Sequence, residues 1–209
     1  MPTRSPSITT KWKVTIDNVD TAEGSPTLST VLSEMFPGVT TSSELTQQIE
    51  TFTPPPIQEV FEEVQYGGLR PGRVLRGVEP MITTFETRGA LGAVLNVFLG
   101  EVVTLTFTSV AKAARTVTMS VPSAPVYEQY TVQGELEQST PPGYGHDTAA
   151  SESLQIYGLD IRRAVSTDNS SWKFTTHVNL DQLIYARGYG NAVGDLTNYF
   201  ADEREFVGA

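Results

Sequence analysis

The sequence predicts a mainly β protein: two packed antiparallel sheets in a sandwich or barrel-like body, one flanking α-helix and a long protruding hairpin. Segments in which apolar and polar residues alternate recur along the chain, and short turns join most of them. Serine and threonine are frequent, whereas charged residues make up only 18% of the chain, below the usual roughly 25%. Because threonine is a good strand former, this composition favours strands with one polar face.

The length and charge of the chain limit what it does. Its 209 residues suffice for a single domain, 1–209, with a sizeable core. The net charge of −10 serves solubility and also predicts repulsion of nucleic acids and anionic membranes. The chain has no cysteine, which excludes disulfides and thiolate metal sites. The lack of cysteine fits assembly in the cytoplasm. The sequence shows no signal-peptide h-region and no apolar run of about 18 residues, so we expect no signal peptide and no membrane-spanning segment.

The N-terminal part predicts one strand followed by a long insertion. Residues 11–17 alternate, with tryptophan, valine and isoleucine on one face. Residues 20–46 are rich in serine, threonine, proline and glycine, and we expect an insertion or extended loop there. Within it, residues 28–36 predict a short helix that a Pro-Gly pair ends.

Residues 57–80 predict the protruding hairpin. Three consecutive prolines before it force an extended entry, because each fixes its own φ and disfavours helix in the preceding residue. The outgoing arm is acidic and alternates imperfectly, as expected of an arm that leaves the core. A Gly-Gly pair at the turn accepts positive φ without strain.

In residues 89–100 the spacing of the apolar residues changes to that of a helix, which predicts the flanking helix. The apolar residues fall at i, i+3, i+4, i+7 and i+8 of one helical face: Leu91, Val94, Leu95, Phe98 and Leu99. Gly100 is placed to end the helix. A helix this short depends on packing against the body for its stability.

The rest of the chain predicts strands joined by turns. They are expected at residues 102–108, 116–121, 126–137, 153–164 and 172–180. The first two carry threonine on one face and apolar residues on the other. A loop rich in glycine and proline, 138–150, interrupts the series, and a polar tail follows from residue 187.

Two motifs suggest a phosphate-binding loop and a metal or acid–base site. Neither carries the residues that such a site requires. The glycine-rich turn at 67–72 lacks the Lys-Ser/Thr pair and the following helix of a phosphate-binding loop, so a hairpin tip is favoured. His146 precedes Asp147, but the only other histidine is His177, on the polar face of a predicted strand. Two scattered histidines are more typical of surface residues than of a metal site or an acid–base pair.

Three further kinds of candidate site, a carboxylate pair, a serine nucleophile and a sugar-binding platform, also lack the features that their function requires. Glu62 and Glu63 are adjacent in a strand and point to opposite faces, so they cannot act on one bond as acid and base. No serine lies in a G-x-S-x-G motif. Trp12 and Trp172 would suit a sugar-binding platform, but both lie on apolar strand faces and are expected in the core. We therefore expect no catalytic residue, no metal and no cofactor.

Three stretches, taken in order, resemble a known family. The first runs from Pro56 to Gly72 through the acidic arm and the Gly-Gly turn. The second is GVEPMITTFETRG at 77–89, a strand that enters the helix, and the third combines GNAVGDL at 190–196 with REFVG at 204–208. Over about residues 48–209 the chain resembles the major tail tube proteins of contractile-tailed bacteriophages. Residues 20–46 depart from that pattern, because they are longer than the family usually allows.

The resemblance implies a structural virion protein and no enzyme. Family members form hexameric rings that stack into the hollow inner tube of the tail, through which DNA passes during ejection. The implied partners are further copies of the chain, the tail sheath protein, the tape measure protein, and the baseplate and tail terminator at the tube ends. Assembly in the host cytoplasm and a place in the virion follow, with no membrane partner.

The resemblance also implies roles for particular residues. The hairpin would contact a neighbouring subunit or ring through Glu59, Glu62, Glu63, Gly67, Gly68, Leu69, Arg70, Pro71, Gly72 and Arg73. The threonine-rich strand faces would line a polar lumen through Thr104, Thr106, Thr116 and Thr118.

Other functions remain open on the sequence alone. Within the same class, the chain would serve equally as the inner tube subunit of a phage-derived contractile injection particle, which carries no genome. In a different class, a monomeric β-sandwich that binds carbohydrate or protein has the same composition. A hydrolase on a β-fold is a third alternative and requires a convergent polar cleft.

Overall fold

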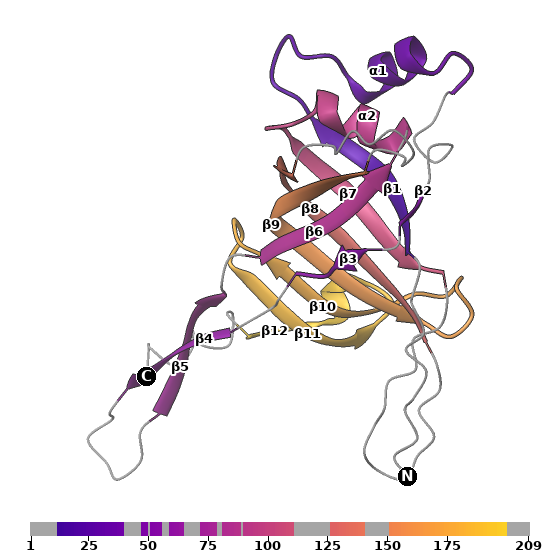
Figure 1. Cartoon of the computed structure of the whole chain (residues 1–209). Coiled ribbons are helices and arrows are strands. Elements are labelled where there is room, and N and C mark those ends of the chain that lie inside the picture. Colours follow the sequence, from indigo (N-terminus) through magenta and orange to yellow (C-terminus); the bar gives the residue numbers. More distant parts are fainter. Residues whose placement is uncertain are drawn as a thin grey trace, which may run out of the picture.

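The structure, a computed structural model, describes residues 12–39, 47–49, 51–55, 59–64, 72–78, 81–88, 90–110, 126–140 and 151–199. Within these ranges the chain is mainly β, with one large antiparallel sheet, one separate strand pair and two short α-helices (Figure 1). The elements are β1 (Trp12–Asp20), α1 (Leu28–Met35), β2 (Gln47–Ile49), β3 (Phe52–Thr53), β4 (Glu59–Val64), β5 (Gly72–Val78), β6 (Met81–Arg88), α2 (Ala90–Val97), β7 (Val102–Ser109), β8 (Tyr127–Thr140), β9 (Ser151–Ser166), β10 (Lys173–Asn179), β11 (Ile184–Gly190), the 3-10 turn η2 (Val193–Asp195) and β12 (Thr197–Asn198).

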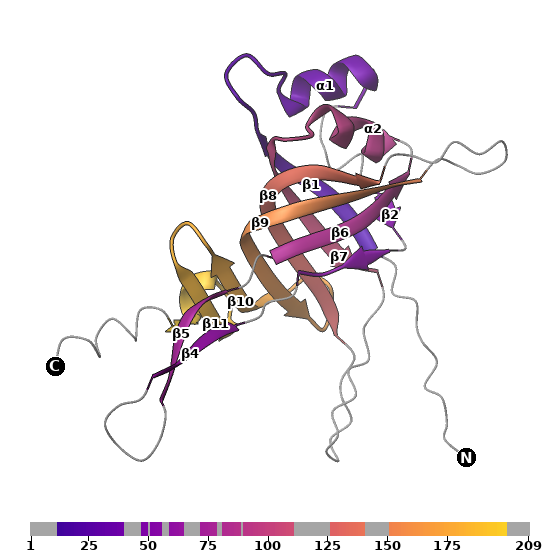
Figure 2. The ribbon, with the colours of Figure 1, turned by 60° about the vertical axis from the view of Figure 1, so that its left-hand side comes forward.

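Hydrogen-bonded strand pairs join most of the large sheet into a closed ring of strands. β7 pairs with β1 and β8, β8 pairs with β9, and β9 pairs with β6. The segment that carries β2 and β3 closes this ring, because β2 pairs with β1 and β3 pairs with β6. The sheet thus curls into a barrel-like body (Figure 2), and the described strands do not form the two packed sheets that the sequence predicts. The alternation of apolar and polar residues shows which face of a strand is buried. It does not show whether that face packs against a second sheet or against a distant part of the same curved sheet.

The longest strand, β9, connects the barrel to a sheet extension. Its first half pairs with β6 and its second half with β10, while β8 follows it along the other edge. Leu159 is the extra residue of a bulge at the changeover, between the pairs Gln133–Asp160 and Gly134–Gly158. A Cβ at Gly134 would lie 2.0 Å from the carbonyl oxygen of Tyr157, so only glycine fits there. Beyond this point β10, β11 and β12 extend the sheet.

The barrel interior holds the core that the alternating strands predict. Trp12, Val14 and Ile16 of β1 are buried, as are Val103, Leu105 and Phe107 of β7 and Tyr130, Val132 and Leu136 of β8. Phe52 of β3 stacks on Phe107 of β7 with 4.3 Å between ring centroids. Since these strands are not neighbours in the sheet, the contact spans the interior of the barrel.

The helix α2 packs on the barrel much as the sequence predicts. Its residues Leu91, Val94 and Leu95 are buried, and Phe98 is buried just beyond its end. The expectation for Leu99 is wrong, because it lies past the last helical turn and is 37% exposed. Gly100 has a φ of +85° and its N–H donates to the carbonyl of Leu136 (2.8 Å), which ends the helix against β8.

A buried carboxylate fixes α2 to the sheet. Glu152 of β9 accepts hydrogen bonds from Asn96 of α2 (2.6 Å) and from Thr87 of β6 (3.3 Å). A Cβ at Gly92 would lie 2.2 Å from the Oε1 of Glu152 and 2.8 Å from the hydroxyl of Thr87, so a larger residue there would displace this carboxylate. These contacts complement the apolar face of α2.

The expectation of one flanking helix is also corrected, because the predicted segment 28–36 forms the second helix, α1. Thr27 caps its N-terminus by accepting from the N–H of Thr30 (3.3 Å). Val31 and Leu32 are buried. The interval 20–46 is therefore partly helical; residues 40–46 lie outside the described ranges.

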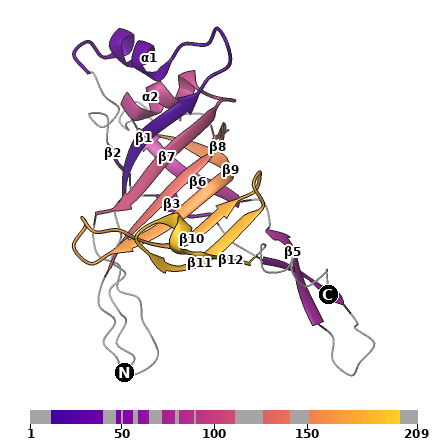
Figure 3. The same ribbon diagram turned by 180° about the vertical axis from the view of Figure 1, so that it is seen from behind.

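The strand pair β4–β5 occupies the position of the predicted hairpin. The two strands run antiparallel from the pair Glu59–Val78 to the pair Val64–Gly72. The pair lies apart from the barrel in Figures 1 and 3, whereas in the view of Figure 2 it overlaps β10 and β11. It is inserted between β3 and β6, which pair directly with each other. The predicted tip, 65–71, lies outside the described residues.

The C-terminal part departs most from the sequence prediction. Part of the predicted polar tail forms β11, η2 and β12, and residues 200–209 lie outside the described part. Residues 138–140 of the predicted loop 138–150 belong to β8, whereas residues 141–150 and the predicted strand 116–121 lie outside the described part. The turn after β9 is present, with Asp168 accepting from the N–H groups of Ser170 (2.9 Å) and Ser171 (2.8 Å). These bonds lower the pKa of Asp168 well below its usual value.

A buried hydroxyl in β6 provides a test of the core. Thr83 is fully buried, and its hydroxyl has no hydrogen-bond partner among the residues that the structure describes. Thr83→Val is expected to raise the free energy of unfolding by about 1 kcal/mol, because a methyl of the same shape replaces an unsatisfied polar group. Thermal unfolding measures the change. Thr87→Val is the matched control on the same strand: it removes a hydrogen bond to Glu152 and should lower stability. A Thr83→Val protein that melts no higher than wild type would contradict the prediction.

Candidate functional site

A broad polar surface covers the outer side of the sheet from β1 to β10. Residues paired across antiparallel strands share a face. The register therefore places three rows of polar side chains side by side: Lys13, Thr108 and Gln129; Thr15, Thr106, Thr131, Arg162 and His177; and Thr104, Gln133, Asp160 and Asn179. The alternate row, Ile16, Leu105, Val132, Ile161 and Val178, is fully buried in the core. We call the twelve polar residues the polar sheet face.

The predicted lumen residues that the structure describes lie on this surface. Thr104 and Thr106 are on the polar sheet face and are partly exposed. Thr116 and Thr118 fall outside the described residues.

The predicted hairpin residues are brought together in part. The structure places Glu59, Glu62 and Glu63 in β4, and Gly72 and Arg73 in β5, where Arg73 pairs with Glu63 in the ladder. The other predicted residues of the hairpin tip lie outside the described ranges: Gly67, Gly68, Leu69, Arg70 and Pro71.

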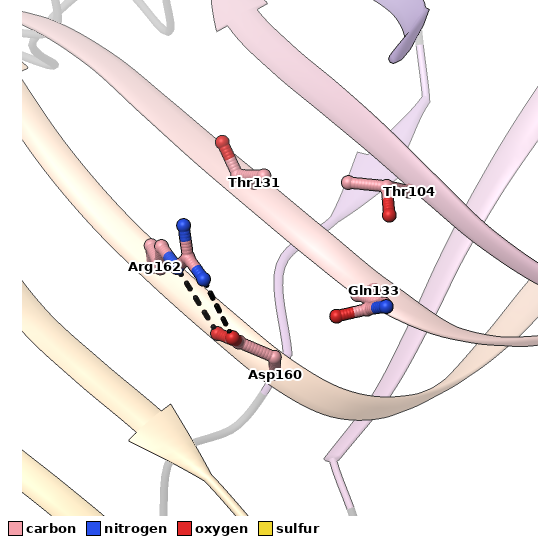
Figure 4. Close-up of a pocket in the computed structure, with 5 residues that line it drawn as sticks. All are labelled: Thr104, Thr131, Gln133, Asp160 and Arg162. Atoms are coloured by element: carbon pink, nitrogen blue, oxygen red, sulfur yellow. Dashed lines mark hydrogen bonds and ion pairs between the residues drawn. The ribbon is translucent and has the colours of Figure 1, made fainter. Parts of the chain in front are cut away.

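A charged cluster centred on Asp160 lies within the polar sheet face. Arg162 donates to both of its oxygens, from Nε at 3.3 Å and from Nη2 at 2.8 Å (Figure 4). The ring of His177 lies 3.2 Å from Oδ1, and Asn179 donates to Oδ2 at 3.2 Å. Burial alone would raise the pKa of Asp160, but the hydrogen bonds of His177 and Arg162 and the charge of Arg162 outweigh it and lower the pKa to about 2.

Sequence reasoning placed His177 on a polar strand face, which is correct, but expected a surface side chain, which is not. His177 is only 9% exposed, because it lies between Arg162 of β9 and Ala186 of β11 and contacts Asp160. The strand β11, which pairs beside it, is not predicted from the sequence. The cluster as a whole carried no sequence signal, since its members come from two strands whose register depends on bulges.

Hydroxyl and amide groups occupy the rest of the polar sheet face. Thr106 donates to Asp17 (2.5 Å) and shares a hydrogen bond with Thr131 (3.0 Å). Gln133 donates to Asp20 (3.3 Å) at the end of β1. Burial raises the pKa of Asp17 above its ordinary value, although the hydrogen bond from Thr106 opposes this. Polar groups on this surface are thus largely bonded to one another.

The geometry offers little for catalysis. A pocket of about 230 Å³ on this surface is lined by Thr104, Thr131, Gln133, Asp160 and Arg162 (Figure 4). It is smaller than the roughly 300–1,000 Å³ of typical ligand sites. Asp160 is a poor general base near neutral pH, because its pKa is low and its oxygens already accept hydrogen bonds.

Two further findings concern the described residues as a whole. They contain no group of three or more side chains placed to hold a metal ion. Neither α1 nor α2 has the length and apolar character that crossing a membrane requires.

In comparisons with known proteins, no family model and no curated protein matches the chain.

The low pKa of Asp160 predicts a stability change in acid. The carboxyl has an ordinary pKa of 3.8 when unfolded and about 2 when folded, so its contribution is complete above pH 3.8 and is lost as the pH falls through 2. The loss is about 2 kcal/mol, from the size of the shift. Urea unfolding at pH 7 and at pH 2 measures it. Asp160→Asn should be less stable than wild type at pH 7 and should lose less stability on acidification; an equal loss in both proteins would contradict the assignment.

Proposed function

We propose that this protein is the subunit of a hollow tube, the inner tail tube of a contractile-tailed phage, and that it acts by assembly and not by catalysis. The observation that carries the proposal is the polar sheet face. It spans five paired strands, and its opposite side is the core of the domain. Many of its polar groups are hydrogen-bonded to one another or to Asp17 and Asp20 of β1. Such a surface suits a wall along which another molecule moves without binding.

The chemistry of this surface supports transport of DNA. Threonine and glutamine side chains present neutral groups, and Asp160 balances the charge of Arg162. The whole chain carries a net charge of −10, which repels phosphate. A protein binds DNA through cationic side chains that neutralise phosphates and release their counterions. Because this surface has few positive charges, it holds DNA weakly.

The β4–β5 pair supports self-association. A two-stranded hairpin by itself is at best marginally stable in water and gains stability from packing against a further surface. In this chain the pair forms its own sheet and lies apart from the barrel (Figure 3). A neighbouring copy in a ring or in the next ring supplies the missing surface in our proposal.

Partners follow from the resemblance and belong to the proposal. They are further copies in hexameric rings, a sheath outside the tube, a tape measure protein inside it, and proteins of the baseplate and terminator at its ends. The inner tube of a contractile injection particle fits the same observations. A monomeric carbohydrate- or protein-binding module is the alternative, and the pocket beside Arg162 is the place where it would bind.

Negative-stain electron microscopy of the purified protein over a concentration series tests the proposal. Rings with a central hole, or stacked hollow tubes, are expected at high concentration. Sedimentation of the same samples provides the quantitative control. Monomers at every concentration, both alone and after addition of preformed tube ends as initiators, would favour the binding module instead.

A further inference from the structure

A permanent positive charge lies within the polar sheet face, on β9. Of the residues that define this surface, Lys13 of β1 and Arg162 of β9 carry such a charge. The Arg162 side chain is 43% exposed and lines the small pocket together with Thr104, Thr131 and Gln133. A guanidinium surrounded by hydroxyl and amide donors is a favourable arrangement for binding phosphate.

The carboxylate of Asp160 already occupies the binding edge of that guanidinium. It accepts from both Nε and Nη2, which is the paired geometry by which arginine also binds a phosphate group. The Asp160 side chain is only 8% exposed, and His177 and Asn179 hold its oxygens from β10. The carboxylate is therefore fixed in position by groups on a second strand and does not depend on Arg162 alone.

We propose that Asp160 prevents the polar sheet face from binding phosphate groups by occupying Arg162. The excluded ligand is the phosphate backbone of nucleic acid. The identification of DNA as the passing molecule rests on the proposed function, whereas the masking of Arg162 is a property of the folded subunit. Asp160 is thus a positioning and specificity residue: it determines what the surface does not bind.

Asp160→Asn tests the proposal, because asparagine keeps the shape and one acceptor oxygen but removes the charge. The measurement is a titration of the isotope-labelled full-length protein with inorganic phosphate, followed by NMR. In the variant, saturable shifts are expected for the resonances of Thr104, Thr131 and Arg162. Wild type should show none over the same phosphate concentrations. The double variant with Arg162→Gln should lose the response.

Asp20→Asn is the matched control for net charge. Asp20 accepts from Gln133 near the same surface but forms no ion pair with Arg162, whose partner is Asp160. The control should therefore bind no phosphate. A response equal to that of Asp160→Asn would overturn the proposal, because a general loss of negative charge would then explain both.

The remaining outcomes also decide the question. An Asp160→Asn protein that is folded, by its NMR spectrum, and binds no phosphate would overturn the masking role. If that variant does not fold, Asp160→Ser replaces it; failure of both to fold would assign Asp160 a purely structural role and likewise overturn the proposal. Absence of tubes by electron microscopy would contradict the proposed function and leave the phosphate result unaffected, so the two failures are distinguishable.

Discussion

Replacing Leu95 with aspartate is expected to unfold the subunit. Leu95 lies on α2 with no exposed side-chain surface, among the buried residues of the core. The substitution removes a leucine side chain from the core and places a carboxyl group in an apolar environment. The cost is at least about 4 kcal/mol, a large part of the roughly 5–15 kcal/mol that stabilises a typical domain. Circular dichroism with temperature should show a large fall in the melting temperature or no folded state.

Val97→Asp is the matched control for this prediction. Val97 lies on the same helix but is 45% exposed, so a charge there remains in contact with water. Its melting temperature should stay close to that of wild type. If Leu95→Asp melted as wild type does, the helix would not pack on the core in the way described. If both variants unfolded, loss of helix propensity and not burial would be the cause.

The sequence predicts the core better than it predicts the sheet arrangement. Alternation identified the buried faces of β1, β7 and β8, since burial of every second residue follows directly from strand geometry. The helical period identified the face of α2 for the same reason. Closure of the barrel depends on contacts between distant segments, such as Phe52 against Phe107, and no local pattern encodes them.

The missed strands show a second limit. Residues 184–190 include two glycines and three consecutive exposed residues, Arg187, Gly188 and Tyr189, and so lack clear alternation. The strand forms because β10 provides a hydrogen-bonding edge and the following turn packs closely on it. A Cβ at Gly190 would lie 2.3 Å from the Cβ of Asp195, so the approach depends on glycine. Propensity gives little weight to such a strand, because its stability is tertiary.

The candidate site was predictable only in part. Thr104 and Thr106 were found because they alternate regularly along one strand. Asp160 and His177 come together through the pairing of β9 with β10, in which a bulge at Thr175 shifts the register by one residue. A period of two cannot locate an extra residue, so the cluster appears only when the paired strands are seen together.

Replacing the β4–β5 hairpin, Glu59–Val78, with a short glycine–serine linker is expected to abolish long tubes while leaving a folded subunit. The subunit should stay folded because β3 and β6 pair directly on either side of the insertion, so a short linker is enough to connect them. Tubes should be lost because the hairpin is the proposed stacking arm. Circular dichroism checks the fold, and electron microscopy with sedimentation measures the tubes.

A second replacement controls for the loss of chain length. The same linker in place of residues 141–150 shortens a connection between β8 and β9, whose ends also pair directly, at Thr140 and Ser153. This variant should form tubes, because its missing segment has no part in the proposed stacking. Tubes of normal length from the hairpin variant would show that β4–β5 is not the stacking arm. Loss of tubes in the control alone would move that role to the β8–β9 connection and would leave the barrel, with its polar sheet face, as the wall.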